Sequence, residues 1–367
     1  MRHANLLSPA QLGLFQLRNH VVMAPMTRSR AIGNVPQDIA ATYYAQRATA
    51  GLIITEGTSP SPNGLGYARI PGVFTQEQAV AWRKVTDAVH AEGGKIFIQL
   101  MHTGRVSHQD NLPAGAEVLS ASAILAAGDM WTDQGGMQKN NQPAAMTATQ
   151  IQAAIAEFAA AARLAVEVAG FDGVELHAAN GYLLEQFLHP SANERQDQYG
   201  GSMENRRRFV LEVTAAVAAA IGKERVGIRL SPYGVGGGMP GAFEQVDESF
   251  TDLAAHLSAL DVAYLHVVDH SAMGAPKVPE TLLHQMRAAF KNTLILCGNY
   301  DATRAEADLA SGLADLIAFG RPFIANPDLV ERFESGAPLA QPDATKFYTP
   351  GAEGYIDYPT LAEVTLN

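Results

Sequence analysis

The stretch Val226-Gly-Ile-Arg-Leu-Ser231 is a short apolar run that ends in polar residues, and the chain contains eight runs of this kind. Most of them are continuously apolar rather than alternating, which is typical of strands buried on both faces of a parallel sheet. The other seven runs occupy residues 21–25, 52–57, 95–100, 173–177, 264–269, 294–298 and 316–320.

Helical patterns fill the segments between these runs, at residues 36–48, 75–92, 149–169, 204–221, 248–260, 279–290, 303–311 and 327–333. Thr75 before Gln78 and Thr303 before Glu306 predict capping boxes at two helix starts. Eight strands that alternate with eight helices predict a (β/α)₈ TIM barrel. A doubly wound sheet with a second domain is the alternative. We favour the barrel, with residues 1–367 as one domain, because the numbers of strand patterns and of helix patterns are both eight and no linker divides the chain.

Two glycine-rich stretches are not part of the eight strands and eight helices that a minimal barrel needs. Residues 101–148 follow the third strand and are too long for an ordinary loop, so we expect an insertion that is either a lid over the catalytic face or a solvated excursion. Residues 233–243 contain a formal G-x-G-x-x-G at Gly236, Gly238 and Gly241. Pro240 lies inside this motif and no apolar helix follows it, so it is weak evidence for a dinucleotide site.

Composition excludes several classes of function. The chain has 26 Lys and Arg against 37 Asp and Glu, a net charge of −11, which argues against nucleic acid or an anionic membrane as partner. A single cysteine, Cys297, excludes a disulfide framework, a zinc ribbon and a four-cysteine iron–sulfur cluster. No secretory signal is visible in residues 1–17, and charges interrupt the apolar residues 153–171, so we expect a cytoplasmic protein without a membrane span.

Chemistry in such a barrel collects at the carboxyl ends of the strands. Gly298 and Gly320 end the seventh and eighth strands, where barrels hold phosphate, and Arg321 adds a charged partner. Gln99, Thr27 and Arg229 end three other strands, and together they suit a flat heterocycle with imide edges. A phosphorylated flavin and a sugar phosphate both remain open on these residues.

The fourth strand is followed by His177, Asn180 and Tyr182. The first two could polarise one oxygen atom, and the phenol could deliver a proton, whereas the simpler alternative is a structural hydrogen bond. His266, Asp269 and His270 could be a metal cluster, but their spacing does not favour one, and we expect no metal. Lys95 opens its strand and so lies at the wrong end of a barrel for Schiff-base chemistry.

Five stretches of the chain resemble the Old Yellow Enzyme family of FMN-dependent ene-reductases over nearly the whole length. They are Val22-Met-Ala-Pro-Met-Thr-Arg28, His177-Ala-Ala-Asn-Gly-Tyr-Leu-Leu-Glu-Gln-Phe-Leu188, Tyr199-Gly-Gly-Ser-Met-Glu-Asn-Arg206, Ala318-Phe-Gly-Arg-Pro-Phe-Ile-Ala-Asn-Pro327 and Gly354-Tyr-Ile-Asp-Tyr-Pro-Thr360. The chain is most similar to the branch that contains bacterial N-ethylmaleimide and nitrate-ester reductases.

This resemblance implies FMN over the mouth of the barrel and NADPH or NADH as the hydride donor. It also implies that an activated alkene takes a hydride at its β-carbon, held by His177 and Asn180, and a proton at its α-carbon from Tyr182. Met101, Phe347 and Tyr348 would complete the substrate pocket. The residues implied for the cofactor are Ala24, Pro25, Met26, Thr27, Gly57, Gln99, Arg229, Cys297, Gly298, Asn299, Gly320 and Arg321.

One residue departs from the family's pattern. Where many relatives carry tryptophan, this chain has Met101, whose thioether is narrower and more flexible, so we expect a differently shaped pocket. A sugar-phosphate isomerase or lyase on the same barrel, and a flavin-binding protein without catalysis, are the alternative functions. We expect a monomer or a small homo-oligomer.

Overall fold

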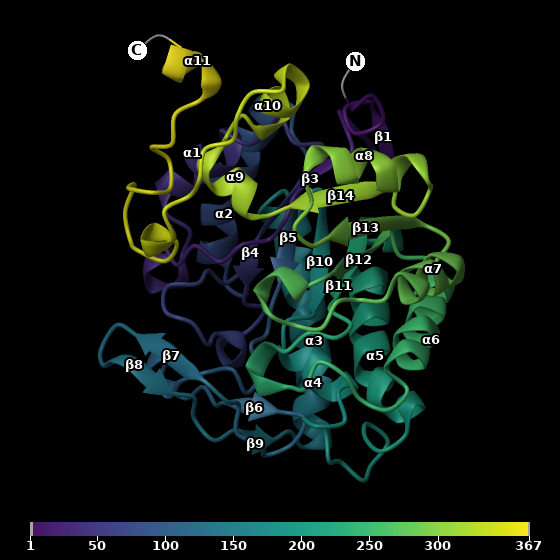
Figure 1. Ribbon diagram of the computed structural model, residues 1–367. Coiled ribbons are helices and arrows are strands. Elements are labelled where there is room, and N and C mark those ends of the chain that lie inside the picture. The colour runs from purple at the N-terminus through teal and green to yellow at the C-terminus, as the bar shows by residue number, and fades with distance from the viewer. Residues whose placement is uncertain (1–2, 366–367) are drawn as a thin grey trace.

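The computed structural model describes residues 3–365, and its centre is a closed barrel of eight parallel strands (Figure 1). Each strand pairs with the next along the chain, and the last pairs with the first. The predicted TIM barrel is therefore confirmed, while the single domain over residues 1–367 stays a prediction. The barrel strands are β3 (Val21–Met23), β4 (Leu52–Thr58), β5 (Ile96–Leu100), β10 (Gly173–Ala178), β11 (Val226–Leu230), β12 (Tyr264–Val268), β13 (Thr293–Cys297) and β14 (Leu316–Phe319).

The register of the strands brings distant polar residues to one level of the barrel. Glu175 on β10 pairs with Gln99 on β5, while Arg229 on β11 pairs with both His177 on β10 and His266 on β12. In seven of the eight strands every residue is buried, and in β13 only Thr293 and Cys297 at its two ends are half-buried. Most of these residues are apolar. A polar layer inside the barrel thus follows from a few residues that interrupt otherwise apolar runs.

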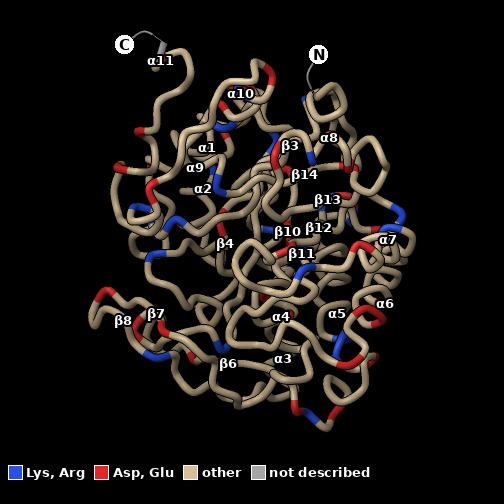
Figure 2. Tube along the Cα trace, viewed as in Figure 1, with Lys and Arg blue, Asp and Glu red and all other residues tan. Residues whose placement is uncertain are grey.

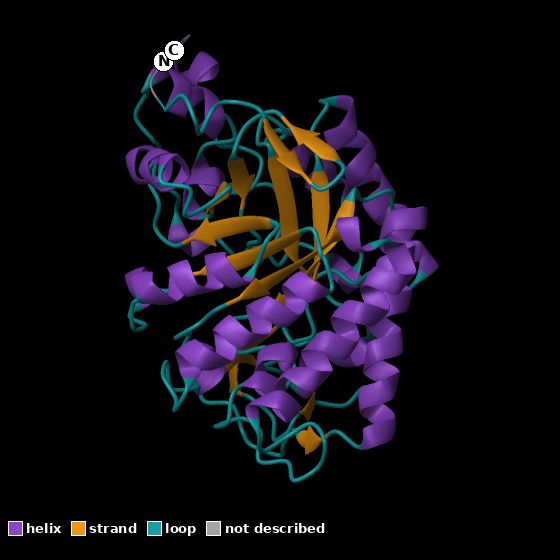
Figure 3. Cartoon of the chain, turned by 90° about the vertical axis from the view of Figure 1, so that its right-hand side faces the viewer, coloured by secondary structure: helices purple, strands orange, loops and turns teal. Residues whose placement is uncertain are grey.

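Helices surround the barrel, as Figure 3 shows from the side. Their apolar faces pack on the outer faces of the strands in one large core, whereas the β1–β2 hairpin (Ala10–Leu12 and Phe15–Leu17) packs on a smaller core inside the barrel. The sequence patterns did not indicate this hairpin. The helices between strands are α1 (Asp38–Ala45), α2 (Gln76–Ala91), α3 (Ala148–Arg163), the short α4 (Leu183–Leu188), α5 (Met203–Ile221), α6 (Val246–Ala259), α7 (Glu280–Ala289) and α8 (Ala302–Ala310), and α9 (Arg321–Ala325) and α10 (Leu329–Ser335) follow β14.

The expected insertion is present between β5 and α3. It holds two small sheets, β6 (Leu119–Ser120) with β9 (Ala144–Ala145) and the hairpin of β7 (Asp129–Thr132) with β8 (Gly136–Lys139). Figure 1 shows the hairpin projecting from the rest of the molecule. Asp133 at its tip forms an ion pair with Arg69, so the hairpin is tied to the loop after β4. Its role as a lid stays a prediction.

The two predicted capping boxes had different outcomes. At α2, Thr75 and Gln78 form the expected box, with the Thr75 side chain accepting from the Gln78 N–H. At α8 the prediction was wrong, because the N-cap is Asp301, whose carboxyl accepts from the Arg304 N–H. Glu306 instead accepts hydrogen bonds from Asn5 and Leu6, so a contact with the distant amino-terminal segment replaces the local one.

Acidic and basic residues are interspersed around the outside of the barrel in Figure 2. Among residues 3–365, no helix combines the length and the apolar character needed to cross a membrane.

The corrected cap at α8 can be tested by two alanine substitutions. Asp301→Ala removes the side-chain acceptor at the N-cap and should lower the free energy of unfolding by about 1 kcal/mol. Thr303→Ala, two residues away and also exposed, should change it by less than about 0.5 kcal/mol. Urea unfolding at a fixed FMN concentration measures both. The larger loss at Thr303 would contradict the assignment.

Candidate active site

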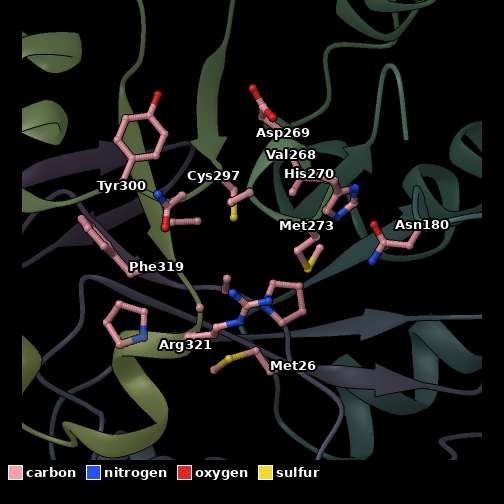
Figure 4. Close-up of a pocket in the computed structure, with 18 of the residues that line it drawn as sticks. Met26, Asn180, Val268, Asp269, His270, Met273, Cys297, Tyr300, Phe319 and Arg321 are labelled. Atoms are coloured by element: carbon pink, nitrogen blue, oxygen red, sulfur yellow. The ribbon is translucent and has the colours of Figure 1, made fainter. Parts of the chain in front are cut away.

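A cavity of about 330 Å³ opens at the carboxyl ends of the strands (Figure 4). It collects residues from β11, β12, β13 and β14, from the segments that follow β3 and β10, and from the carboxyl-terminal segment. Thirteen of the residues predicted for the site line it. They are Ala24, Pro25, Met26, Thr27, Asn180, Arg229, Cys297, Gly298, Asn299, Gly320, Arg321, Phe347 and Tyr348.

The other five predicted residues lie beside this cavity rather than on its wall. Gly57 is packed against the Met101 side chain so closely that a Cβ atom would collide with the thioether sulfur. Gln99 is buried in the polar layer of the barrel. His177 and Tyr182 stand edge to face with ring centroids 4.8 Å apart, at the end of β10 that also presents Asn180 to the cavity.

Glu175 organises the polar layer beneath the cavity. Its carboxyl group is fully buried and accepts hydrogen bonds from Gln99 Nε2 at 2.8 Å, from the Tyr264 hydroxyl at 3.1 Å and from His266 Nδ1 at 2.8 Å. Sequence reasoning missed this residue, although a charged side chain within the apolar run 173–177 was a usable signal. Because Gln99 donates from Nε2 to Glu175, which lies beneath the cavity, its Oε1 atom stays free to accept from a ligand in the cavity.

His177 is a neutral hydrogen-bond donor. Its Nδ1 atom accepts from the Ala179 N–H at 3.2 Å, which leaves the proton on Nε2. Burial, together with the charge of Arg229, holds the pKa of His177 well below its usual value. The side chain can therefore donate to an oxygen atom without itself carrying charge.

Asn180 owes its position to a close approach of two loops. Its φ of 61° lies in the left-handed region, and its backbone N–H donates to the Ser231 hydroxyl at 2.8 Å. A Cβ atom on Gly236 would collide with the Asn180 carbonyl group, so that glycine is required where the loops meet. The glycine-rich stretch 233–243 thus positions Asn180 and gives no support to a dinucleotide motif.

Tyr182 has a partner that sequence reasoning did not find. Its hydroxyl lies 2.9 Å from the hydroxyl of Tyr67, which comes from the loop after β4. Burial and the neighbouring Tyr67 raise the pKa of Tyr182 well above its usual value, so its proton is retained across the physiological pH range. No local pattern around Tyr67 marks it as a functional residue, because the contact spans 115 positions.

Arginines hold the carboxyl-terminal segment that carries Phe347 and Tyr348. Arg28 donates to the carbonyl groups of Phe347 and Gly354, at 3.2 and 2.6 Å. Arg30 donates to four carbonyl groups between residues 346 and 353. The aromatic pair is therefore fixed at the cavity by side chains that follow β3, the first strand of the barrel.

Comparison with known proteins agrees with this geometry. The family NADH:flavin oxidoreductase / NADH oxidase matches residues 5–340. The chain belongs to this family. It is 42% identical to 12-oxophytodienoate reductase 7 of Oryza sativa subsp. japonica, over 99% of this chain and 96% of the relative. Morphinone reductase has a similar structure, with a TM-score of 0.93, 46% identity and 99% of each chain covered.

A further solved relative is an old yellow enzyme homologue from Zymomonas mobilis, with a TM-score of 0.92 and 42% identity over 97% of this chain and all of that one. The Old Yellow Enzyme family predicted from sequence is thus confirmed, as are FMN as cofactor and NAD(P)H-dependent ene reduction as the activity. The comparisons do not support the isomerase or the flavin-binding alternative. Placement in the N-ethylmaleimide and nitrate-ester reductase branch stays a prediction.

Unsatisfied polar atoms show that the cavity fits FMN. Arg229 Nε and Asn180 Oδ1 are buried and have no hydrogen-bond partner among the described residues. Gln99 Oε1 is free to accept from an imide N–H. Gly298 and Gly320 line the cavity, and their backbone N–H groups stay available because, within the described chain, only their carbonyl groups are used, by Arg304 and by the Phe323 N–H. These are the groups that a ring with imide edges and a phosphate require. Within residues 3–365, no cluster of three His, Cys, Asp or Glu side chains could hold a metal ion.

The role of Glu175 can be tested with Glu175→Gln. An amide cannot accept from all three donors, and a buried donor without a partner costs about 1–3 kcal/mol. Because Gln99 then loses its fixed orientation, we expect FMN to bind roughly tenfold more weakly, measured by fluorescence titration. Glu212→Gln is the matched control, since Glu212 accepts from the Tyr199 hydroxyl far from the cavity. Unchanged FMN affinity in Glu175→Gln would refute the positioning role.

Proposed function

We propose that this site reduces activated alkenes, namely α,β-unsaturated carbonyl compounds, maleimides and nitroalkenes, with Tyr182, His177 and Asn180 as catalytic residues. The observation that carries the proposal is the group of neutral donors at the end of β10, beside a cavity that suits a flavin. The chemistry supplied by bound FMN is the transfer of a hydride from NAD(P)H to the β-carbon of the alkene.

His177 and Asn180 bind the carbonyl or nitro oxygen of the substrate. The Nε2–H of His177 and the side-chain amide of Asn180 donate to it, and negative charge on that oxygen grows as the β-carbon accepts a hydride. The His177 ring is fixed before substrate arrives by the Ala179 N–H, and the backbone of Asn180 is held by the Ser231 hydroxyl. Little reorganisation is needed in the transition state.

Tyr182 protonates the α-carbon. Its raised pKa keeps the phenol protonated, and the hydrogen bond with Tyr67 gives the donor a defined direction. Burial also raises the pKa of Tyr67, so this half-buried phenol retains its own proton. We propose Tyr67 as the group that holds the Tyr182 hydroxyl in place.

The remaining predicted residues hold the cofactor and the substrate. Gly298, Asn299, Gly320 and Arg321 would bind the phosphate, and Thr27, Gln99 and Arg229 the pyrimidine edge of the ring, with Ala24, Pro25, Met26, Gly57 and Cys297 around them. Phe347 and Tyr348 would wall the substrate pocket. The protein would act in the cytoplasm as a monomer or a small homo-oligomer, without nucleic acid or membrane as partner.

An anaerobic absorbance experiment tests this function. NADPH added to the purified protein should bleach the flavin band, and 2-cyclohexenone should restore it. Tyr182→Phe should keep the first step and slow the second by 10²–10⁴-fold, the usual contribution of a positioned general acid. A colourless protein that cannot be reconstituted with FMN would overturn the proposal, as would an unchanged second step in Tyr182→Phe.

Met101 is expected to set facial selectivity. Its side chain is buried in a cluster with Leu65 and Ile70, against which Tyr67 and Tyr182 pack, so it shapes the wall from which the proton is delivered. Met101→Trp should alter the stereochemical outcome for bulky substituted cyclohexenones, which chiral chromatography of the products measures. Met101→Leu, which nearly conserves volume, should leave it unchanged. Identical outcomes for the wild type and Met101→Trp across several enones would contradict this role.

A further inference from the structure

Cys297 lies at the carboxyl end of β13 on the wall of the cavity, and Figure 4 shows its sulfur atom directed into the open space. It is the only cysteine of the chain. Its thiol group lies 3.8 Å from Nη2 of Arg229 and is in contact with the imidazole of His266. The sulfur atom thus has both a permanent cation and a base beside it.

Two buried residues, Glu175 and His266, lie behind this thiol in the interior of the barrel. His266 is fully buried and donates from Nδ1 to Glu175 at 2.8 Å, which turns its Nε2 atom toward Cys297. That Nε2 atom, like Nε of Arg229, has no hydrogen-bond partner among residues 3–365. Arg229 lines the cavity wall where the sulfur lies, and His266 lies behind that wall. In space, Glu175, His266 and Cys297 follow one another as an orienting acid, a base and a nucleophile do.

The electrostatics agree with this geometry. Burial alone would raise the pKa of the Cys297 thiol, but the neighbouring His266 and the charge of Arg229 lower it below its usual value. Although burial opposes it, Glu175 raises the pKa of His266, so the imidazole is a better proton acceptor than an isolated buried histidine. A thiolate is the nucleophilic form of cysteine.

We propose that Cys297 is a modification site for electrophilic alkenes, which react with it when FMN is not bound. The inference rests on the proposed substrate class, because an alkene polarised for hydride is also a target for a thiolate. Asn180 and Arg229 line the same cavity and can bind the substrate oxygen near the sulfur. Bound FMN prevents the reaction by occupying the cavity, so the cofactor protects the chain from the electrophiles it reduces.

The addition balances without any redox partner. His266 takes the thiol proton, and the sulfur forms a bond to the β-carbon. The π-electron pair of the C=C bond moves to the α-carbon and its conjugated oxygen. The α-carbon then takes the proton back from the imidazolium of His266. The product is a thioether, with no leaving group and no change in the number of electrons.

N-ethylmaleimide is the probe, and intact mass is the readout, because one cysteine allows one thiol adduct. The FMN-free chain, shown to be folded by recovery of the bound-flavin spectrum on adding FMN, should gain one maleimide at Cys297. The rate should be at least tenfold above that of the urea-denatured chain. Saturating FMN without NAD(P)H should slow it at least tenfold. A rate no faster than that of the denatured chain, or no protection by FMN, would overturn the inference.

Three variants test which residues are responsible for the reaction with maleimide. Cys297→Ser should give no adduct, and His266→Gln should react about tenfold more slowly than the wild type. His284→Gln on α7, where the histidine is exposed, is the matched control and should react at the wild-type rate. If His266→Gln does not fold, the protection of the wild-type thiol by FMN still tests the inference. An active ene-reductase with an inert thiol defeats this inference alone, whereas a reactive thiol without alkene reduction defeats only the proposed function.

Discussion

The pairing of β14 with β3 closes the barrel, and the site depends on that closure. Ile317 pairs with Val21 and Phe319 with Met23, so segments almost 300 residues apart become neighbours. Residues 24–27 then line the cavity directly beside Gly320 and Arg321. The same closure places Arg28 and Arg30 where they bind the carbonyl groups of the carboxyl-terminal segment. Without it, neither the cofactor cradle nor the aromatic wall of Phe347 and Tyr348 would exist.

A second constraint lies one level lower, in the buried carboxyl group of Glu175. Burying such a group is costly unless its oxygen atoms are hydrogen-bonded, and here three donors from two strands of the barrel, β5 and β12, satisfy them. The same contacts orient Gln99 toward the cavity and turn His266 toward Cys297. One buried acid thereby links the packing of the barrel interior to the cofactor side and to the thiol side of the site.

The barrel, the capping box at Thr75 and the cavity residues could be predicted from the sequence because each depends on local patterns or on strand ends that a barrel must bring together. The cap at Asp301 and the hydroxyl pair of Tyr67 with Tyr182 could not. Glu306 accepts a hydrogen bond from Asn5, which lies 301 positions away, instead of capping α8. Tyr67 contacts Tyr182 only because of the fold of the loop after β4. Strand-end reasoning found residues that face the cavity and missed those that hold them in place.

The distribution of charge explains how one cavity can favour hydride delivery. Burial lowers the pKa of His177 and raises that of Tyr182, so both donors at the end of β10 are neutral. Arg229 supplies a permanent cation across the same cavity, beside Cys297. Neutral donors polarise an oxygen atom most as its charge develops, whereas a cation stabilises an anion already present. In the proposed reaction the substrate oxygen would therefore bind the neutral donors, and Arg229 would face negative charge on the cofactor. When the cofactor is absent, the anion that Arg229 stabilises is the thiolate.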